Sequence, residues 1–114
     1  MAKVGRLAKA GDFQKVFVEG KTVVTRDIVL KVLKLKGQEE SRVGFATSRG
    51  LDNAVKRNRA KRLLREAIRL NHQRLDVSCD IVLVAKKSFQ DKSFFEAQKA
   101  VILALKKAGL LGGG

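Results

Sequence analysis

Residues 54–69, AVKRNRAKRLLREAIR, concentrate the side chains with the clearest chemical potential in this chain. The stretch holds seven cations, which are Lys56, Arg57, Arg59, Lys61, Arg62, Arg65 and Arg69. Glu66 is the one acid among them. Arginine carries a planar, permanently charged guanidinium group that matches phosphate oxygens with paired hydrogen bonds. The stretch therefore predicts binding to a polyanion.

The apolar residues of the same stretch recur at helical spacing. On a helix over 54–73, one face collects Ala60, Leu63, Leu64, Ala67 and Ile68. The opposite side collects Asn58, Lys61, Arg62, Arg65, Arg69 and His72. Glu66 can pair with a neighbouring arginine, but such a pair contributes only about 0.2–0.5 kcal/mol. We expect the leucine face to dock on the protein and the arginine-rich side to bind an external partner.

The charge of the whole chain supports this interpretation. Its 114 residues include 25 Lys and Arg against 11 Asp and Glu, giving a net charge of +14. Residues 49–74 contain nine of these cations and two of the acids, and this segment therefore carries half of the net positive charge of the chain. A hydrophobic content of 45% favours a folded domain. We predict a single RNA-binding domain over 1–111 and a flexible glycine tail at 112–114. RNA is favoured over DNA because no helix-turn-helix or zinc finger accompanies the basic helix.

The sequence offers little for catalysis. One cysteine and one histidine leave no disulfide and no zinc site of usual composition, and phosphate-binding and nucleophile-elbow motifs are absent. We therefore expect no metal, cofactor or small-molecule substrate on the protein itself. No apolar run is long enough to span a membrane, and a reducing cytoplasm is the expected compartment. A ribosomal or other structural RNA-binding protein remains the alternative; a self-sufficient nuclease and a membrane-surface helix are disfavoured.

Local patterns predict an α+β fold, a two-layer α/β sandwich in the order α-β-β(-β)-α-β-α. The expected elements are a helix at 12–19, a long and possibly split strand at 22–35, a strand at 42–48 that forms a hairpin with it, a helix at 54–73, a buried strand at 79–86 and a last helix up to Gly109. Ser93 and Glu96 have the spacing of a capping box at the start of that last helix. Phe94 and Phe95 are interpreted as core residues.

The spacing Arg57-Asn58-x-x-Lys61-Arg62-x-x-Arg65-Glu66-x-x-Arg69 resembles the RNR motif of the bacterial ribonuclease P protein component. The resemblance extends along most of the chain. Residues 12–21, 42–49, 53–55 and 80–87 are similar to the family's first helix, the strand before the motif, its lead-in and a later strand.

This resemblance implies a protein that partners a catalytic RNA. In that family the RNA, with magnesium ions, removes the 5′ leader of precursor tRNA, and the protein binds both the RNA and the leader. The implied fold contains a left-handed crossover between parallel strands. The residues that resemble the face meeting the catalytic RNA are Arg57, Asn58, Arg59, Lys61, Arg62, Arg65 and Arg69. The implied leader-binding cleft contains Phe13, Phe17, Lys31, Arg49 and Lys86.

The chain departs from the family pattern at two places. Residues 28–31, IVLK, offer Ile28 and Lys31 where family members often carry a cleft-facing aromatic residue. We therefore expect a more electrostatic and less stacked contact with the leader. In the loop before the motif, Gly50 replaces a basic residue and Asp52 replaces a glycine. An acid at that position is expected to weaken phosphate contact.

Overall fold

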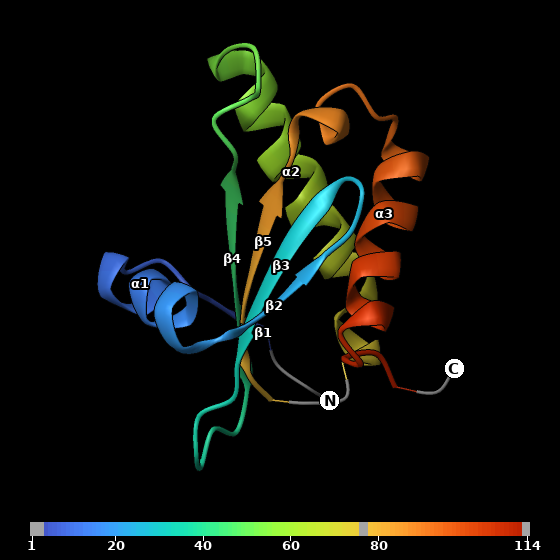
Figure 1. The fold of residues 1–114 in the computed structure, drawn as a ribbon. Helices are drawn as coiled ribbons and strands as arrows, with labels where there is room; N and C mark the ends of the chain where they lie inside the picture. Colours follow the sequence, from blue (N-terminus) through green and yellow to red (C-terminus); the bar gives the residue numbers. More distant parts are fainter. Residues whose placement is uncertain (1–3, 76–77, 113–114) are drawn as a thin grey trace.

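The computed structural model describes residues 4–75 and 78–112 of the chain. Three α-helices surround one sheet of five strands (Figure 1). The helices are α1 (Ala10–Glu19), α2 (Ala54–Asn71) and α3 (Phe94–Lys107), with short 3₁₀ turns at His72–Arg74 and Lys87–Phe89. The strands are β1 (Val4–Arg6), β2 (Lys21–Val24), β3 (Ile28–Leu33), β4 (Ser41–Thr47) and β5 (Asp80–Ala85). The α+β class is confirmed, with one additional strand at the start of the chain.

The strand order in the sheet is β1-β4-β5-β3-β2. The central strand, β5, pairs in parallel with β4 and antiparallel with β3, and its side chains are almost all buried. The predicted hairpin between 22–35 and 42–48 is wrong, because β5 lies between β3 and β4. The predicted long strand is split by the turn at Thr25–Asp27, and its two halves form the actual hairpin, β2–β3.

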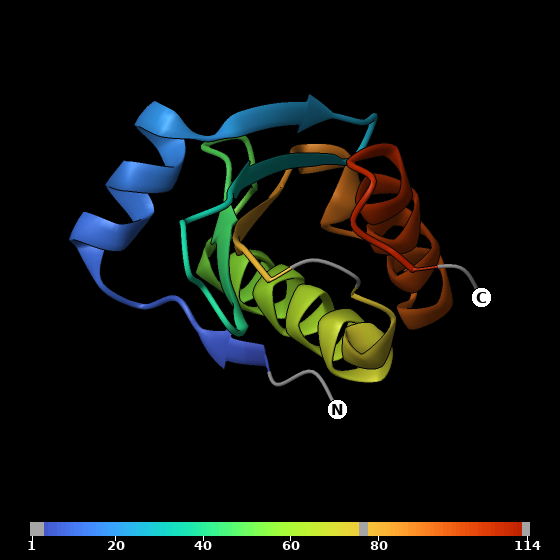
Figure 2. The same cartoon turned by 90° about the horizontal axis from the view of Figure 1, so that it is seen from below.

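The helices cover opposite faces of the sheet. Figures 1 and 2 show α2 and α3 together on one face and α1 alone on the other. Viewed from the side of α2 with the parallel strands upright, β5 lies to the left of β4, so the β4–α2–β5 crossover is left-handed. Most connections of this kind are right-handed. The main hydrophobic core fills the space between the sheet and the helices α2 and α3.

Local sequence signals explain where the helices begin. The side chain of Asn53 accepts a hydrogen bond from the backbone N–H of Lys56 and so caps α2. Ser93 and Glu96 form the predicted capping box of α3. Gly20 follows α1 at a close approach: a Cβ there would lie 2.5 Å from the carbonyl oxygen of Val16 and 2.7 Å from that of Val32. Only glycine fits this junction between α1 and β2.

An ion-pair network around the buried carboxylate of Asp80 ties α1 to the sheet. The side chain of Asp80 is 3% exposed and accepts hydrogen bonds from Arg42 at 2.9 and 2.6 Å and from Gln38 at 2.7 Å. Arg42 also reaches Asp12 on α1, with 3.4 Å between Nη1 and Oδ2. The Asp80 side chain, by hydrogen bonding and charge, raises the pKa of the Arg42 guanidinium. This network fixes α1 against the starts of β4 and β5.

Two further predictions concern the C-terminal region. Phe94 and Phe95 are not core residues: they are 45% and 65% exposed, and the ammonium group of Lys99 lies 4.5 Å from the Phe95 ring centroid. The predicted glycine tail begins at Gly112, whose backbone N–H donates to the carbonyl oxygen of Arg74. The rest of that tail, residues 113–114, lies outside the described residues.

Candidate RNA interface

Helix α2 docks on the sheet through the apolar face that its spacing predicts. Ala60, Leu64 and Ala67 are fully buried, Ile68 is 4% exposed and Leu63 packs at the edge of the core. Burial of these side chains sets the rotation of the helix about its axis. The motif residues between them are therefore directed to the flanks and the outer side of the helix.

We define the basic ridge as Arg57, which is exposed in the first turn of α2, together with Asn58, Lys61, Arg62, Arg65 and Arg69 along the outer side of the helix. Four of these side chains leave their donors available. Among the described residues, the guanidinium groups of Arg57, Arg62 and Arg65 form no hydrogen bond or ion pair, and neither does the ammonium group of Lys61. Such groups keep their full hydrogen-bonding capacity for phosphate oxygens.

Two motif arginines have intramolecular partners. Arg59 turns toward the segment before α3 and donates to the carbonyl oxygens of Gln90 at 3.0 Å and Lys92 at 2.7 Å. Arg69 donates from Nε to both carboxylate oxygens of Glu66 at 3.1 Å, and this hydrogen bonding lowers the pKa of Glu66. The geometry gives Arg59 a positioning role within the protein, because its guanidinium group joins α2 to the 90–92 segment.

A polar cluster holds the loop before α2. We define the loop network as Asp52, Lys56, Lys87, Gln90 and Asp91. Gln90 donates to the Asp52 carboxylate at 2.9 Å, and the ammonium group of Lys87 lies 3.4 Å from it. The hydrogen bond from Gln90, assisted by Lys87, lowers the pKa of Asp52. Lys56 pairs with Asp91 at 2.5 Å.

The loop network qualifies the prediction for Asp52. Its carboxylate faces two ammonium groups of the protein, with Lys56 4.0 Å away, so it neutralises local cations and also anchors the loop. The sequence analysis counted Lys56 among the cations of the basic stretch, but it placed neither Lys56 nor Lys87 beside Asp52. Lys56 lies four residues after Asp52, and Lys87 follows the end of β5. These positions in the sequence do not reveal that both ammonium groups lie near the Asp52 carboxylate, because that proximity depends on the fold. Arg49, in the same loop, is exposed.

The face of the sheet that bears α1 contains most of the residues predicted for the leader. Phe13 is half-buried and packs with Leu7, Val16 and Val82. Phe17 is 40% exposed, and the ammonium group of Lys31 lies 5.6 Å from its ring centroid. The structure thus brings Phe13, Phe17 and Lys31 together beside α1.

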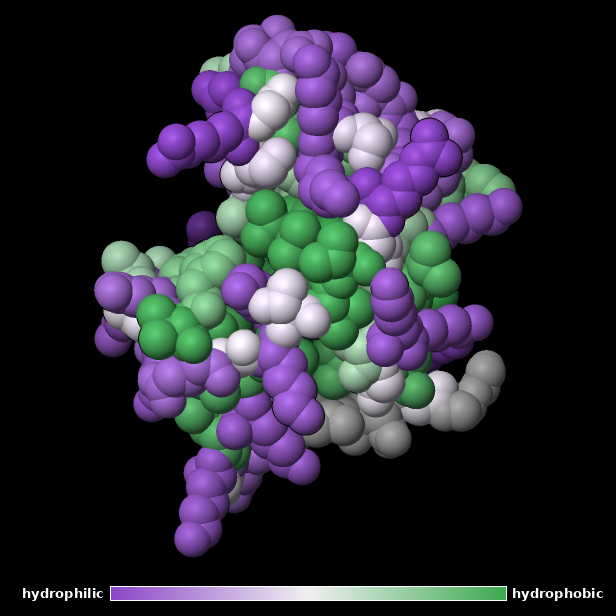
Figure 3. Space-filling model, viewed as in Figure 1, coloured by the Kyte–Doolittle hydropathy of each residue, from purple (hydrophilic) through white to green (hydrophobic). Residues whose placement is uncertain are grey.

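The remaining part of this face is more open. Figure 3 shows a hollow between α1 and the hydrophilic end of the molecule that carries the start of α2. Lys86 lies at the end of β5, where its ammonium group donates to the carbonyl oxygen of Thr25 at 3.2 Å. Ile28, which was expected to face the cleft, is buried in the main core on the opposite face of the sheet. Val29 and Lys31 occupy the α1 side of β3 instead.

The fold and the motif agree with one family of known proteins. The family described as Ribonuclease P matches residues 1–109 of this chain. The chain belongs to the ribonuclease P protein family. It is therefore a subunit of an RNA-processing enzyme, and proteins of this family work with the RNase P RNA.

Individual relatives cover nearly the same length. The chain is 41% identical to the ribonuclease P protein component of Bacillus velezensis over 96% of its own length and 94% of that protein. It is 42% identical to the component from Symbiobacterium thermophilum, over 97% and 96% of the two chains. The solved structure of the Staphylococcus aureus RNase P protein superposes with a TM-score of 0.86 at 29% identity, covering 96% of this chain and all of that one.

The described residues lack the features of two other kinds of site. Within residues 4–75 and 78–112, no group of three or more histidine, cysteine, aspartate or glutamate side chains is placed to hold a metal ion. No helix in the same part of the chain has the length and apolar composition of a membrane span.

Proposed function

We propose that this ribonuclease P protein is the RNA-binding accessory subunit of the enzyme. The basic ridge binds the catalytic RNA, and the α1 side of the sheet binds the 5′ leader of precursor tRNA during 5′ maturation. The observation that carries this proposal is that Arg57, Lys61, Arg62 and Arg65 form no hydrogen bond or ion pair within residues 4–75 and 78–112. Several guanidinium groups aligned on a helix that is fixed by its buried apolar face can contact successive phosphates of an RNA backbone.

The α1 side of the sheet suits a single strand. Phe17 offers an exposed ring on which a base can stack, and Lys31 and Lys86 supply positive charge along the same side. Arg49, exposed in the loop after β4, adds a further cation for the leader. Since β3 presents Val29 and Lys31 there rather than an aromatic residue, the contact is largely electrostatic. The leader therefore binds with strong salt dependence and little preference for sequence.

Catalysis resides in the RNA. Magnesium ions bound by that RNA supply the Lewis acid and the activated water of hydrolysis. The protein contributes affinity, because neutralising phosphates on both RNA molecules favours their association at low magnesium concentration. The cytoplasm, where precursor tRNA is processed, is the expected compartment.

The leader contact is tested with the holoenzyme assembled from this chain and the RNase P RNA of Bacillus velezensis. Affinity is measured for precursor tRNA with a short single-stranded leader and for mature tRNA. The wild type is expected to prefer the precursor, and Lys31→Gln should reduce that preference. Lys106→Gln, on the exposed side of α3, is the charge-matched control. Equal affinity of the wild-type holoenzyme for both RNAs would contradict a leader site on this protein.

A further inference from the structure

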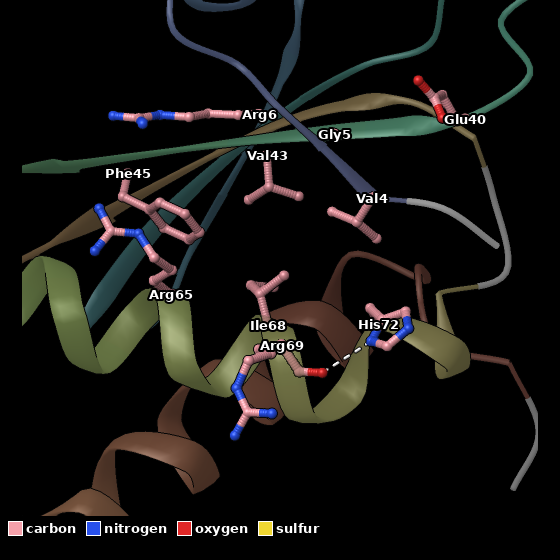
Figure 4. A pocket seen from close by; sticks show the side chains of 10 residues that line it. All are labelled: Val4, Gly5, Arg6, Glu40, Val43, Phe45, Arg65, Ile68, Arg69 and His72. Carbon is pink, nitrogen blue, oxygen red and sulfur yellow. Dashed lines mark hydrogen bonds between the residues drawn. The ribbon is translucent and has the colours of Figure 1, made fainter.

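A cavity of about 730 Å³ lies between α2 and the β1–β4 edge of the sheet (Figure 4). Val4 from β1, Val43 and Phe45 from β4 and Ile68 from α2 point toward one another across it. These side chains give the cavity an apolar interior. Its volume falls in the range of about 300–1,000 Å³ that is usual for sites of small organic groups.

The mouth of the cavity is continuous with the basic ridge. Arg65 and Arg69 both line it, and the Arg65 guanidinium carbon lies 5.6 Å from the centroid of the Phe45 ring. His72 closes the other end, with Nδ1 2.8 Å from the carbonyl oxygen of Arg69. Arg6 and Glu40 also border the cavity, but Figure 4 shows both side chains directed away from its interior.

We propose that this cavity receives one unstacked base of the catalytic RNA while Arg65 holds the adjoining phosphate. The proposal rests on the proposed function. It adds the burial of one base, a contact that binding of phosphates by the basic ridge does not by itself require. Extruded bases in RNA loops are recognised by burial against aromatic, apolar and guanidinium groups. An apolar cavity that opens directly beneath an unpaired ridge arginine combines these groups with a phosphate ligand.

Charge favours a nucleotide over an apolar partner in this position. Three of the cavity's border residues are arginines and one is an acid. Arg69 pairs with Glu66, but the Arg65 guanidinium group has no ion-pair partner among the described residues, so an uncharged apolar segment would enter beneath an unneutralised charge. A nucleotide satisfies both parts of the site, because its base is largely apolar on its faces and its phosphate is anionic. The ridge that binds the neighbouring phosphates delivers this nucleotide to the cavity.

The variant Val4→Trp tests the proposal while keeping every cation. Val4 is half-buried on an edge strand and points into the cavity, so an indole ring there occupies the space of the base. The chain contains no tryptophan, and the fluorescence of the new residue therefore reports whether it is buried in a folded protein. Leu103→Trp, at a 58% exposed position on α3, is the matched control.

The measured quantity is the dissociation constant for the RNase P RNA of Bacillus velezensis. Val4→Trp should weaken binding about tenfold, which is within the range for loss of one stacked base, and should leave the salt dependence unchanged. Chemical probing of the RNA should show one base that the wild type and Leu103→Trp protect and that Val4→Trp leaves reactive. Phe45→Leu keeps an apolar side chain but removes the ring, and it should leave the same base reactive. This second variant keeps the proposal testable if Val4→Trp does not fold.

The outcomes separate the two proposals. Tight, salt-dependent binding by the wild type with no loss in folded Val4→Trp or Phe45→Leu would overturn the base-binding cavity and leave the ridge proposal standing. Failure of the wild type to bind the RNA would overturn both.

Discussion

Neutralising the basic ridge should weaken RNA binding and reduce its dependence on salt. The change is the triple substitution of Arg57, Arg62 and Arg65 by Gln. Each phosphate contact contributes about 0.7–0.9 to the slope of log affinity against log salt, so the triple variant should lose about 2–3 of that slope. When the salt concentration rises fourfold, the fold-loss of affinity of the wild type should therefore exceed that of the triple variant by a factor of roughly 15 to 40.

The structure also limits what this triple variant does to stability. None of the three guanidinium groups makes a hydrogen bond or ion pair within the described residues, and only Arg65 lies over a ring, that of Phe45. An exposed contact of that type contributes about 0.5–1 kcal/mol. The melting temperature should therefore fall by no more than about 8 °C.

The assay is fluorescence anisotropy with a labelled RNase P RNA between about 50 and 200 mM salt, with thermal unfolding recorded in parallel. The control replaces Lys34, Lys36 and Lys106 by Gln, three exposed cations away from the ridge. An equal loss of slope in the control would show that net charge, rather than the ridge, governs binding. Unfolding of the triple variant would show that the helix faces are assigned in reverse.

Three further outcomes are expected. Gly44→Ala should destabilise the fold by about 1–3 kcal/mol in urea unfolding, because its Cβ would lie 2.5 Å from the Phe13 ring. It should also impair binding of the leader more than binding of the catalytic RNA. An unchanged unfolding midpoint would contradict the close approach of Phe13 to Gly44. Asp52→Asn should tighten RNA binding and steepen its salt dependence, because it removes the acid that pairs with Lys87, while Lys56 stays paired with Asp91. Weaker binding would show that the anchoring of the loop by Asp52 matters more than the released charge. Burial raises the pKa of the Cys79 thiol from 9.0 to about 11, so the folded state retains this proton more tightly. Its contribution to stability is fully present below pH 9 and should be lost as the pH rises toward 11, by up to about 3 kcal/mol relative to the pH profile of Cys79→Ala. Parallel profiles of stability against pH for the wild type and Cys79→Ala would refute this contribution of the Cys79 thiol.

The sequence predicted those elements whose structure is determined locally. The apolar spacing of α2, the capping box of α3 and the continuous apolar run of β5 each specify one element without reference to the rest of the chain. The basic motif was recognisable for the same reason, because all of its members lie on one helix.

Features that depend on distant contacts could not be predicted from the sequence. Strand β1 has three residues and exists through its parallel pairing with β4, and the insertion of β5 between β3 and β4 leaves no trace in local pattern. The partners of Arg59 are backbone carbonyls more than 30 positions away, so its sequence context could not distinguish it from the free ridge arginines. The cavity beside Phe45 likewise requires the relative placement of α2 and the sheet edge.

The central claim, that this chain assists a catalytic RNA, is tested most directly by cleavage of precursor tRNA at low magnesium concentration. The three reactions contain the protein alone, the RNase P RNA of Bacillus velezensis alone, and both together. We predict removal of the 5′ leader only in the mixture. Cleavage by the protein alone, or a mixture no more active than the RNA, would contradict the account.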